Sequence, residues 1–240
     1  MAKETICIFA SELSGLLDYL KIYNKPSAYF IDRIKIRNKE QAKHNINIVT
    51  VADKIQNNIA LNDKDIKFEK KAIAMINGEY NLNTKEEIII TEKKKDKEIM
   101  SLVIGKLKNN KDLNSEELKY QAVSKGIITE EKCNFKKNQQ SFKKYIDSPN
   151  CKFNICIYGK VDGIEDDTII EFKTRVNNYL NGPRRYEIPQ AMAYMFLSDT
   201  DKLIFIEQYN DNVVRENINF DQDTWDDIIK KIINIINASF

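Results

Sequence analysis

Apolar positions in the first half of the chain recur mostly at helical spacing. A short apolar run at residues 5–9 is followed by leucines at positions 13, 16, 17 and 20, which share one helical face. Ser11 stands at the expected N-cap of that helix. A second helix is predicted over residues 27–38, and the pattern stays mainly helical to about residue 108.

The middle of the chain changes from helical to extended patterning. A helix is predicted over residues 113–126, and Gly126 is placed to end it. Strand character is expected from near Ile127, and it dominates residues 153–173. The pattern returns to helical spacing over residues 183–197.

The last part of the chain predicts a hairpin and a closing helix. Apolar and polar residues alternate over residues 202–209 and 213–220, and the polar residues 210–212 between them suit a turn. An amphipathic helix is predicted over residues 225–236.

This order of elements predicts an α/β fold. Helices come first, followed by strands, a helix, a hairpin and a helix, which favours a mixed central β-sheet flanked by helices. We expect residues 1–126 to form a mainly helical N-terminal region that contributes helices to the core. Residues 127–240 would form the core itself, and a chain of 240 residues can hold both as one structural domain.

Composition is that of a globular protein and argues against several function classes. Hydrophobic residues make up 42% of the chain and charged residues 31%. No apolar stretch approaches the ~20 residues of a membrane span, so no membrane partner is expected. No signal peptide opens the chain and no Cys-x-x-Cys pair occurs, so we expect an intracellular protein that is not secreted. The single histidine argues against a zinc site and against Ser-His or Cys-His hydrolases.

Candidate chemistry is concentrated in two successive strands joined by an acidic turn. The first strand ends at Asp162, and the second carries Glu171 and Lys173 two residues apart. Side chains alternate along a strand, so Glu171 and Lys173 share one face and Phe172 points to the other. A hairpin would bring Asp162 near the face that carries Glu171.

Two carboxylates and an ammonium in one place suit the hydrolysis of a phosphodiester bond. Mg²⁺ and similar cations prefer carboxylate oxygen and keep water and substrate phosphate as further ligands. Asp162 and Glu171 are therefore the predicted metal ligands, and the backbone carbonyl of Phe172 is a candidate third oxygen. Lys173 would orient a water, help to deprotonate it or stabilise charge on phosphorus. A chance glutamate and lysine on a strand are the alternative.

A later helix carries two polar residues on one face. Gln190 and Tyr194 are four residues apart and therefore point the same way. Gln190 is a candidate catalytic residue that can donate and accept hydrogen bonds, and Tyr194 can donate one, so both suit a metal-bound water or a strand backbone. A polar pair on a surface helix is the alternative.

Together these segments resemble the PD-(D/E)xK nuclease superfamily, and more closely its lambda-exonuclease/YqaJ-like, or RecB-like, branch. That branch includes versions carried by large DNA viruses. The matching segments are Gly-Lys-Val-Asp-Gly at residues 159–163, Ile-Ile-Glu-Phe-Lys-Thr-Arg at residues 169–175, and Gln-Ala-Met-Ala-Tyr-Met at residues 190–195. The resemblance implies a restriction-endonuclease-like core and a deoxyribonuclease that depends on Mg²⁺ or Mn²⁺. Its finer implication is a 5′-to-3′ exonuclease in DNA replication, recombination or repair.

The resemblance also implies that Tyr194 contacts DNA, and it assigns roles outside these segments. Ser11, in a weaker match at residues 9–17, would lie near a DNA terminal phosphate. A further metal-binding glutamate of the superfamily would be Glu117 here, or else Glu116, although a glutamate in a first helical turn also suits the helix dipole. Arginine is uncommon in this chain, and the three arginines that flank the motif are candidate phosphate contacts: Arg175, Arg184 and Arg185.

The CRISPR-associated iron–sulfur nucleases look similar at the same motifs, but they hold their cluster partly through three cysteines near the C-terminus. This chain has no cysteine after Cys156, so no iron–sulfur cluster is expected. DNA is the expected partner, and a homo-oligomer or a recombination or replication protein stays open. The alternative functions are a structure- or sequence-specific endonuclease of the same superfamily and a nucleic-acid-binding module that has lost catalysis.

Overall fold

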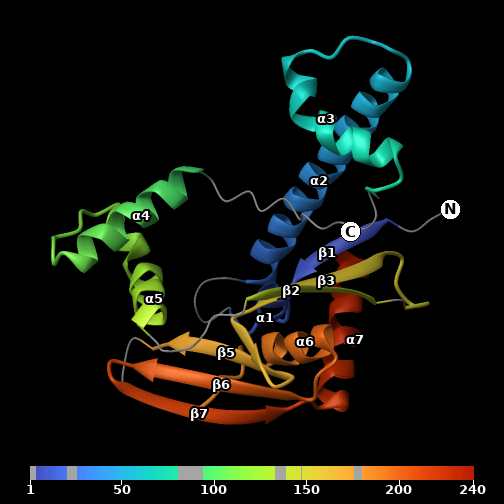
Figure 1. The fold of residues 1–240 in the computed structure, drawn as a ribbon. Coiled ribbons are helices and arrows are strands. Elements are labelled where there is room, and N and C mark those ends of the chain that lie inside the picture. Colours follow the sequence, from blue (N-terminus) through green and yellow to red (C-terminus); the bar gives the residue numbers. More distant parts are fainter. Residues whose placement is uncertain (1–3, 21–25, 81–93, 133–138, 147, 176–179) are drawn as a thin grey trace. The chain divides into compact units, whose positions relative to one another are not determined.

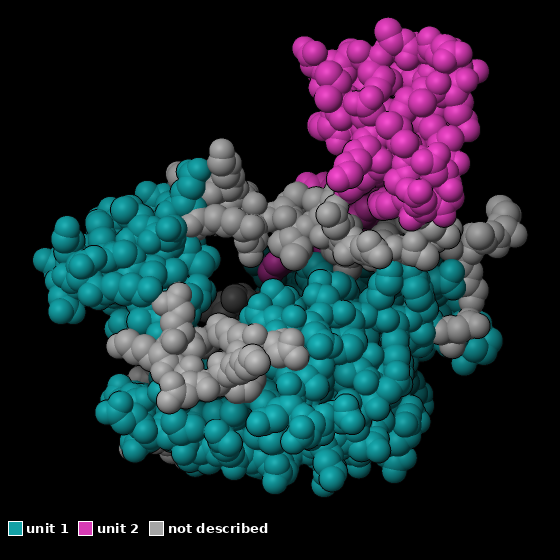
Figure 2. All heavy atoms as spheres, in the orientation of Figure 1, with its two compact units in different colours: residues 1–31, 92–240 teal, residues 32–91 magenta. Residues whose placement is uncertain are grey.

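The computed structural model spans all 240 residues and describes residues 4–20, 26–80, 94–132, 139–146, 148–175 and 180–240. The chain forms two compact units, residues 1–31 with 92–240 and residues 32–91, which Figure 2 colours separately. The boundaries between these units, near residues 31 and 92, differ from the expected boundary between residues 126 and 127. Each unit is described by itself.

The smaller unit is built from two helices. It contains most of α2 (Ser27–Gln56) and all of α3 (Asp63–Ile76). Asn62 caps α3, because its side chain accepts the backbone N–H groups of Lys64 and Asp65 at 2.9 and 3.2 Å. The two helices share one apolar core made of Ile48, Val51, Ala52, Phe68 and Ala72. The predicted helical character is confirmed for the described residues of this region.

The larger unit contains two mixed β-sheets (Figure 1). In the first, the strand order is β1-β3-β2. Strand β1 (Thr5–Phe9) runs parallel to β3 (Asn154–Val161), and β2 (Gln140–Ile146) runs antiparallel to β3. The N-terminal apolar run therefore pairs with a strand far away along the chain.

The second sheet has the strand order β4-β5-β6-β7. Its members are β4 (Gly163–Glu165), β5 (Thr168–Thr174), β6 (Lys202–Tyr209) and β7 (Asn212–Asn219). Strands β5 and β6 are parallel, whereas the β4–β5 and β6–β7 pairs are antiparallel hairpins. The predicted C-terminal hairpin is therefore confirmed.

The predicted α/β class, with helices flanking mixed sheet structure and a helical N-terminal region, is confirmed. The predicted central sheet is present as two sheets. The chain passes from the first to the second at Asp162, which lies between the end of β3 and the start of β4. Because β4 pairs with β5, this passage sets Asp162 beside the strand that carries Glu171 and Lys173.

Helix α6 (Ile188–Ser198) packs against strands of both sheets. Its close approach to β3 depends on Gly159, where a Cβ atom would lie 2.7 Å from Leu197 Cδ1 and 2.9 Å from Tyr194 Cε1. The closing helix α7 (Gln222–Ser239) contacts α6 and is longer than predicted. Helix α6 starts after the predicted residue 183, because a turn occupies the residues before it.

Between α3 and β2, the described residues of the larger unit form the helical elements α4 (Lys94–Lys108), η3 (Glu117–Tyr120) and α5 (Gln121–Lys132). Two predictions are wrong here, since α5 continues through Gly126 and no strand starts at Ile127. A glycine inside a helix costs only about 1 kcal/mol, which the continuing helical turns tolerate. The predicted end of the helix at Gly126 is therefore wrong, because α5 tolerates this glycine in its interior.

The N-terminal helical turn begins directly after β1. It comprises η1 (Ala10–Glu12) and α1 (Leu13–Leu16). Ser11 lies inside η1, so its predicted N-cap role is wrong. Phe9 is the N-cap residue, and the carboxylate of Glu12, the third residue of the turn, accepts its backbone N–H at 3.0 Å. Among the described residues, no helix is both long enough and apolar enough to cross a membrane.

Candidate active site

Strand β5 presents Glu171 and Lys173 on one face and Phe172 on the other, as the alternation predicted. Lys173 Nζ forms an ion pair with Glu171 Oε1. Phe172 packs in a separate apolar cluster with Ile170 and Ile206. The apolar face of β5 thus holds the strand in the sheet, while its opposite face is left for charged groups.

Asp162 is fixed beside β5 by a backbone hydrogen bond. Its Oδ2 accepts the N–H of Phe172 at 3.0 Å. In a strand, the N–H and C=O groups of one residue point to the same edge, so the Phe172 carbonyl is directed to the side where Asp162 lies. The predicted oxygen donors of Asp162, Glu171 and Phe172 therefore lie around one edge of β5. This donor set fits a hard divalent cation.

Burial controls the charge of this site. Glu171 is 3% exposed, and burial raises the pKa of its carboxyl to about 7, with Lys173 opposing this rise and the charge of Asp162 adding to it. Burial lowers the pKa of Lys173, but the Glu171 carboxylate outweighs that effect and leaves the pKa above its usual value. Lys173 therefore stays an ammonium, and a bound cation would favour the ionised form of Glu171.

Helix α6 brings its two polar residues to the same place. Gln190 Nε2 donates a hydrogen bond to the hydroxyl of Tyr194 at 2.7 Å, which confirms that the two side chains share a face. Burial raises the pKa of Tyr194, and the charges of Glu171 and Asp162 raise it further, while the Gln190 bond lowers it. The Tyr194 ring thus lies within electrostatic reach of both carboxylates, and Gln190 lies next to it.

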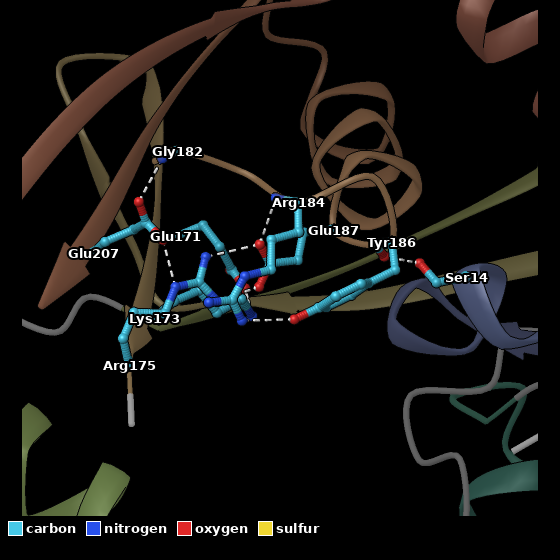
Figure 3. Close-up of polar contacts among 9 residues, drawn as sticks. All are labelled: Ser14, Glu171, Lys173, Arg175, Gly182, Arg184, Tyr186, Glu187 and Glu207. Atoms are coloured by element: carbon cyan, nitrogen blue, oxygen red, sulfur yellow. Dashed lines mark hydrogen bonds and ion pairs between the residues drawn. The ribbon is translucent and has the colours of Figure 1, made fainter. Parts of the chain in front are cut away.

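Arg175 is buried, and its guanidinium is bonded to two carboxylates (Figure 3). Its Nη1 and Nη2 donate to the two carboxylate oxygens of Glu187 at 2.7 and 2.8 Å. Its Nε donates to Glu207 Oε1. Because these contacts engage the guanidinium inside the protein, we reassign Arg175 from the predicted phosphate contact to the support of the site.

The other two candidate arginines remain available to a ligand. Arg184 is half-buried, and its Nη1 donates to the hydroxyl of Tyr186 at 3.0 Å. Arg185 is exposed, and its guanidinium lies 5.0 Å from the centre of the Tyr19 ring. Ser11 is also exposed, so its hydroxyl can be reached from solvent.

The Glu117 carboxylate is held by two donors near its own helical turn. Both of its oxygens accept from Lys106 Nζ at 2.8 Å, and one also accepts the N–H of Asn114 at 2.9 Å. These two donors hold the pKa of Glu117 below its usual value. Within the described ranges, no three acidic, histidine or cysteine residues gather to hold a metal ion. These contacts give Glu117 a role at the start of a helix, and its assignment as a metal ligand stays a prediction.

Several buried polar residues of this region escaped the sequence analysis. They are Ser14, Glu187 and Glu207, and each contacts the segment between β5 and α6 or the side chain of Arg175. One signal was present in the sequence, because Glu207 follows the alternation that buries Leu203 and Phe205 in β6. A glutamate at such an inward position indicates a partner inside the protein.

Neither a protein-family model nor a curated protein matches this chain. Among solved structures, a protein described as SSO0001 is similar at 20% identity over 57% of this chain and 73% of that chain, with a TM-score of 0.41. An alkaline exonuclease from Laribacter hongkongensis is similar at 18% identity over 62% and 82%, with a TM-score of 0.32. A phage-related exonuclease from Haemophilus somnus 129PT is similar at 14% identity over 60% and 79%, with a TM-score of 0.26. Because these identities and TM-scores are low, the similarities do not assign a function to this chain.

Proposed function

We propose that this protein is a metal-dependent deoxyribonuclease that hydrolyses phosphodiester bonds. One observation carries the proposal, namely that the buried carboxylate of Glu171 shares a strand face with Lys173 and feels the charge of Asp162. A buried carboxylate with a pKa near 7 is costly to keep in a structural role, because its charged form lacks sufficient compensation. A divalent cation would supply that compensation.

The carboxylates of Asp162 and Glu171 and the carbonyl of Phe172 would hold Mg²⁺ or Mn²⁺. When bound, such a cation activates a water and offsets negative charge on the phosphate. The hydrogen bond from the Phe172 N–H keeps Asp162 oriented toward β5. Two protein carboxylates are sufficient for Mg²⁺, which retains several waters and takes further oxygens from the substrate phosphate.

Lys173 acts on the phosphate as a cation. Its pKa lies above the usual value, so it keeps its proton at neutral pH, and its side chain retains 26% exposure. An ammonium in this position stabilises charge that develops on the phosphate oxygens in the transition state. Tyr194 accepts a hydrogen bond from Gln190, which leaves its own proton to donate to a carboxylate or to the substrate.

We further propose a 5′-to-3′ exonuclease that acts in DNA replication, recombination or repair. The support is the likeness of residues 159–163, 169–175 and 190–195 to end-dependent nucleases. Arg184 and Arg185 would contact the DNA backbone, and the exposed hydroxyl of Ser11 would contact a terminal phosphate.

The test uses end-labelled linear DNA and covalently closed circular DNA, each with Mg²⁺, Mn²⁺ or EDTA. We expect the cation to promote degradation of the linear DNA, EDTA to stop it, and closed circles to be largely spared. A 5′-phosphate should accelerate digestion relative to a 5′-hydroxyl, and Ser11→Ala should reduce that difference. Rapid cutting of closed circles would favour an endonuclease. DNA binding without cleavage under either cation would favour a binding module and refute the enzyme.

A further inference from the structure

A network of buried charges joins the catalytic strand to the helix that carries Gln190 and Tyr194 (Figure 3). Arg175 directly follows β5, Glu207 lies in β6, and Glu187 directly precedes α6. Arg175 is 7% exposed, Glu187 is 5% exposed and Glu207 is 1% exposed. One guanidinium therefore ties together three elements that are separate in the sequence.

The segment that leads into α6 is fastened to the same network. The N–H of Gly182 donates to Glu207 Oε2 at 2.6 Å, and the N–H of Arg184 donates to Glu187 Oε2 at 2.8 Å. The backbone at Gly182 has a φ of +75°, and a Cβ atom there would lie 1.7 Å from Glu216 Oε2. This left-handed backbone conformation favours glycine, which adopts it without steric cost.

A third anchor ties the same segment to the N-terminal helical turn. The carbonyl of Tyr186 accepts a hydrogen bond from the hydroxyl of Ser14 in α1. The start of α6 is thus held by contacts to β6, to Arg175 and to α1. Because Glu187 lies less than one helical turn before Gln190, any shift of Glu187 moves the face that carries Gln190 and Tyr194.

Stability alone does not explain such a network. Buried charge networks contribute little net stability compared with apolar residues of similar size, but they require one specific geometry. Arg175 donates hydrogen bonds from Nη1 and Nη2 to Glu187 and from Nε to Glu207. These directional bonds fix both the distance and the orientation between β5 and α6.

We infer that Arg175 is a positioning residue for phosphodiester cleavage. Through Glu187 and Glu207, it holds the start of α6 against β5 so that Gln190 and Tyr194 meet the substrate at Glu171. This inference rests on the proposed function. Catalysis is sensitive to such placement, since a displacement of about 1 Å can cost on the order of 10²-fold in rate.

The test compares variants that remove the network with and without leaving buried charge behind. Arg175→Met leaves two carboxylates unpaired and can prevent folding. The triple variant Arg175→Met/Glu187→Gln/Glu207→Gln removes all three charges at similar volume, so it is the informative one. Arg215→Met is the matched control, because Arg215 is an exposed arginine in β7 outside the network.

Two measurements separate positioning from folding. Trp225 is the sole tryptophan, and its ring lies 4.7 Å from that of Phe196 in α6, so its emission reports the packing of α6 on α7. Steady-state cleavage of linear DNA then gives kcat and KM. In the triple variant we expect wild-type Trp225 emission, KM within about threefold and kcat lower by about 10²-fold, since DNA affinity is spread over many phosphates. Arg215→Met should retain wild-type kcat.

The outcomes distinguish this inference from the proposed function. A folded triple variant with wild-type kcat overturns the role of Arg175 while the nuclease remains. A wild-type protein that cleaves no DNA with either cation overturns the proposed function, and the inference fails with it.

Discussion

Two clusters of buried charge lie close together on and after β5, and they differ in how completely their carboxylates are satisfied. Glu187 receives two guanidinium N–H groups and the N–H of Arg184, and Glu207 receives Arg175 Nε and the N–H of Gly182. Glu171 instead has a pKa of about 7 although Lys173 is bonded to it.

This difference indicates that the two clusters have different roles. A carboxylate supplied with several donors has no need of a further cation, so the Arg175 network suits a structural purpose. A carboxylate with an incompletely compensated charge can still gain from binding a cation, so the Asp162–Glu171 pair suits chemistry. Variants that treat the two clusters alike should therefore give opposite results.

The largest effect is expected from removing one carboxylate of the site. Asp162→Asn or Glu171→Gln should reduce cleavage by about 10³-fold or more, because a catalytic cation supplies several kcal/mol of charge stabilisation. The melting temperature should stay the same or rise in the metal-free protein, since one of two repelling charges is gone. The measurements are initial cleavage rates on linear DNA and thermal melts.

Asp167→Asn is the matched control for that experiment. Asp167 is an exposed aspartate in the β4–β5 turn with a φ of 61°, a conformation that asparagine adopts readily. It should cleave like the wild type. Full activity of Asp162→Asn and Glu171→Gln would remove both residues from the site.

The reverse behaviour is expected in the other cluster. Arg175→Met should lower the free energy of unfolding by about 3–5 kcal/mol, because it leaves two buried carboxylates without their partner. Urea denaturation at neutral pH measures this loss. If Arg175→Met is as stable as Glu171→Gln, then the two clusters do not differ in the way that the contacts indicate.

A smaller loss of turnover is expected from Lys173→Ala. One cation near the phosphate acts mainly on the transition state, so kcat should fall by about 10²-fold to 10³-fold. DNA affinity should change by less than about threefold, because many phosphate contacts share it. Lys160→Ala, an exposed lysine of β3, is the control. A Lys173→Ala variant with weak binding but normal turnover of bound DNA would make Lys173 a binding residue.

The raised pKa of Glu171 predicts a pH dependence of metal binding. Below pH 7 the carboxyl is mainly protonated, so a cation must displace a proton and its affinity should fall by about tenfold per pH unit. Titration calorimetry with Mn²⁺ between pH 5.5 and 8.5 would show this, and Glu171→Gln should abolish the dependence.

The same raised pKa predicts a pH dependence of stability in the metal-free protein. Between the ordinary carboxyl pKa of 4.5 and the Glu171 pKa of about 7, the folded state binds more protons than the unfolded state. Stability should therefore fall as pH rises through this window, and the opposite slope would contradict the assignment.

The smallest effect is expected from Glu117→Gln. Lys106 and the N–H of Asn114 hold the pKa of Glu117 below its usual value, so its contribution to stability is present at neutral pH and lost as pH falls. Cleavage should stay within about twofold of wild type, and the loss of stability should be smaller than for Arg175→Met. Cleavage rates and thermal melts at pH 7 measure both. A loss of metal-dependent cleavage would return Glu117 to the metal site.

Much of the secondary structure follows from local patterning. The alternation over residues 202–209 and 213–220 is a strand signal that needs no distant partner to recognise, and the structure has a strand at each place. The end of α5 was misplaced because a single glycine is a weak stop signal. Ser11 was misplaced because the helical turn already begins at Ala10, directly after β1, so that Ser11 lies inside it.

The central residues of the candidate site were accessible from sequence because each one sits in a local pattern. Alternation places Glu171 and Lys173 on one face, and the four-residue spacing places Gln190 beside Tyr194. The partners of Arg175 were not accessible in this way. Glu187 and Glu207 approach it from a helix start and a neighbouring strand, and their contacts form only when β5, β6 and α6 pack.

Sequence periodicity therefore indicates which side chains share a direction, because backbone geometry repeats over two or 3.6 residues. It leaves open which charged groups meet across elements, because such encounters depend on sheet register and helix packing. Arg175 illustrates the difference, since arginine beside a catalytic motif suggests a phosphate contact, whereas burial between two glutamates gives it a different partner. The raised pKa of Glu171 is likewise a product of tertiary burial, which no local pattern contains.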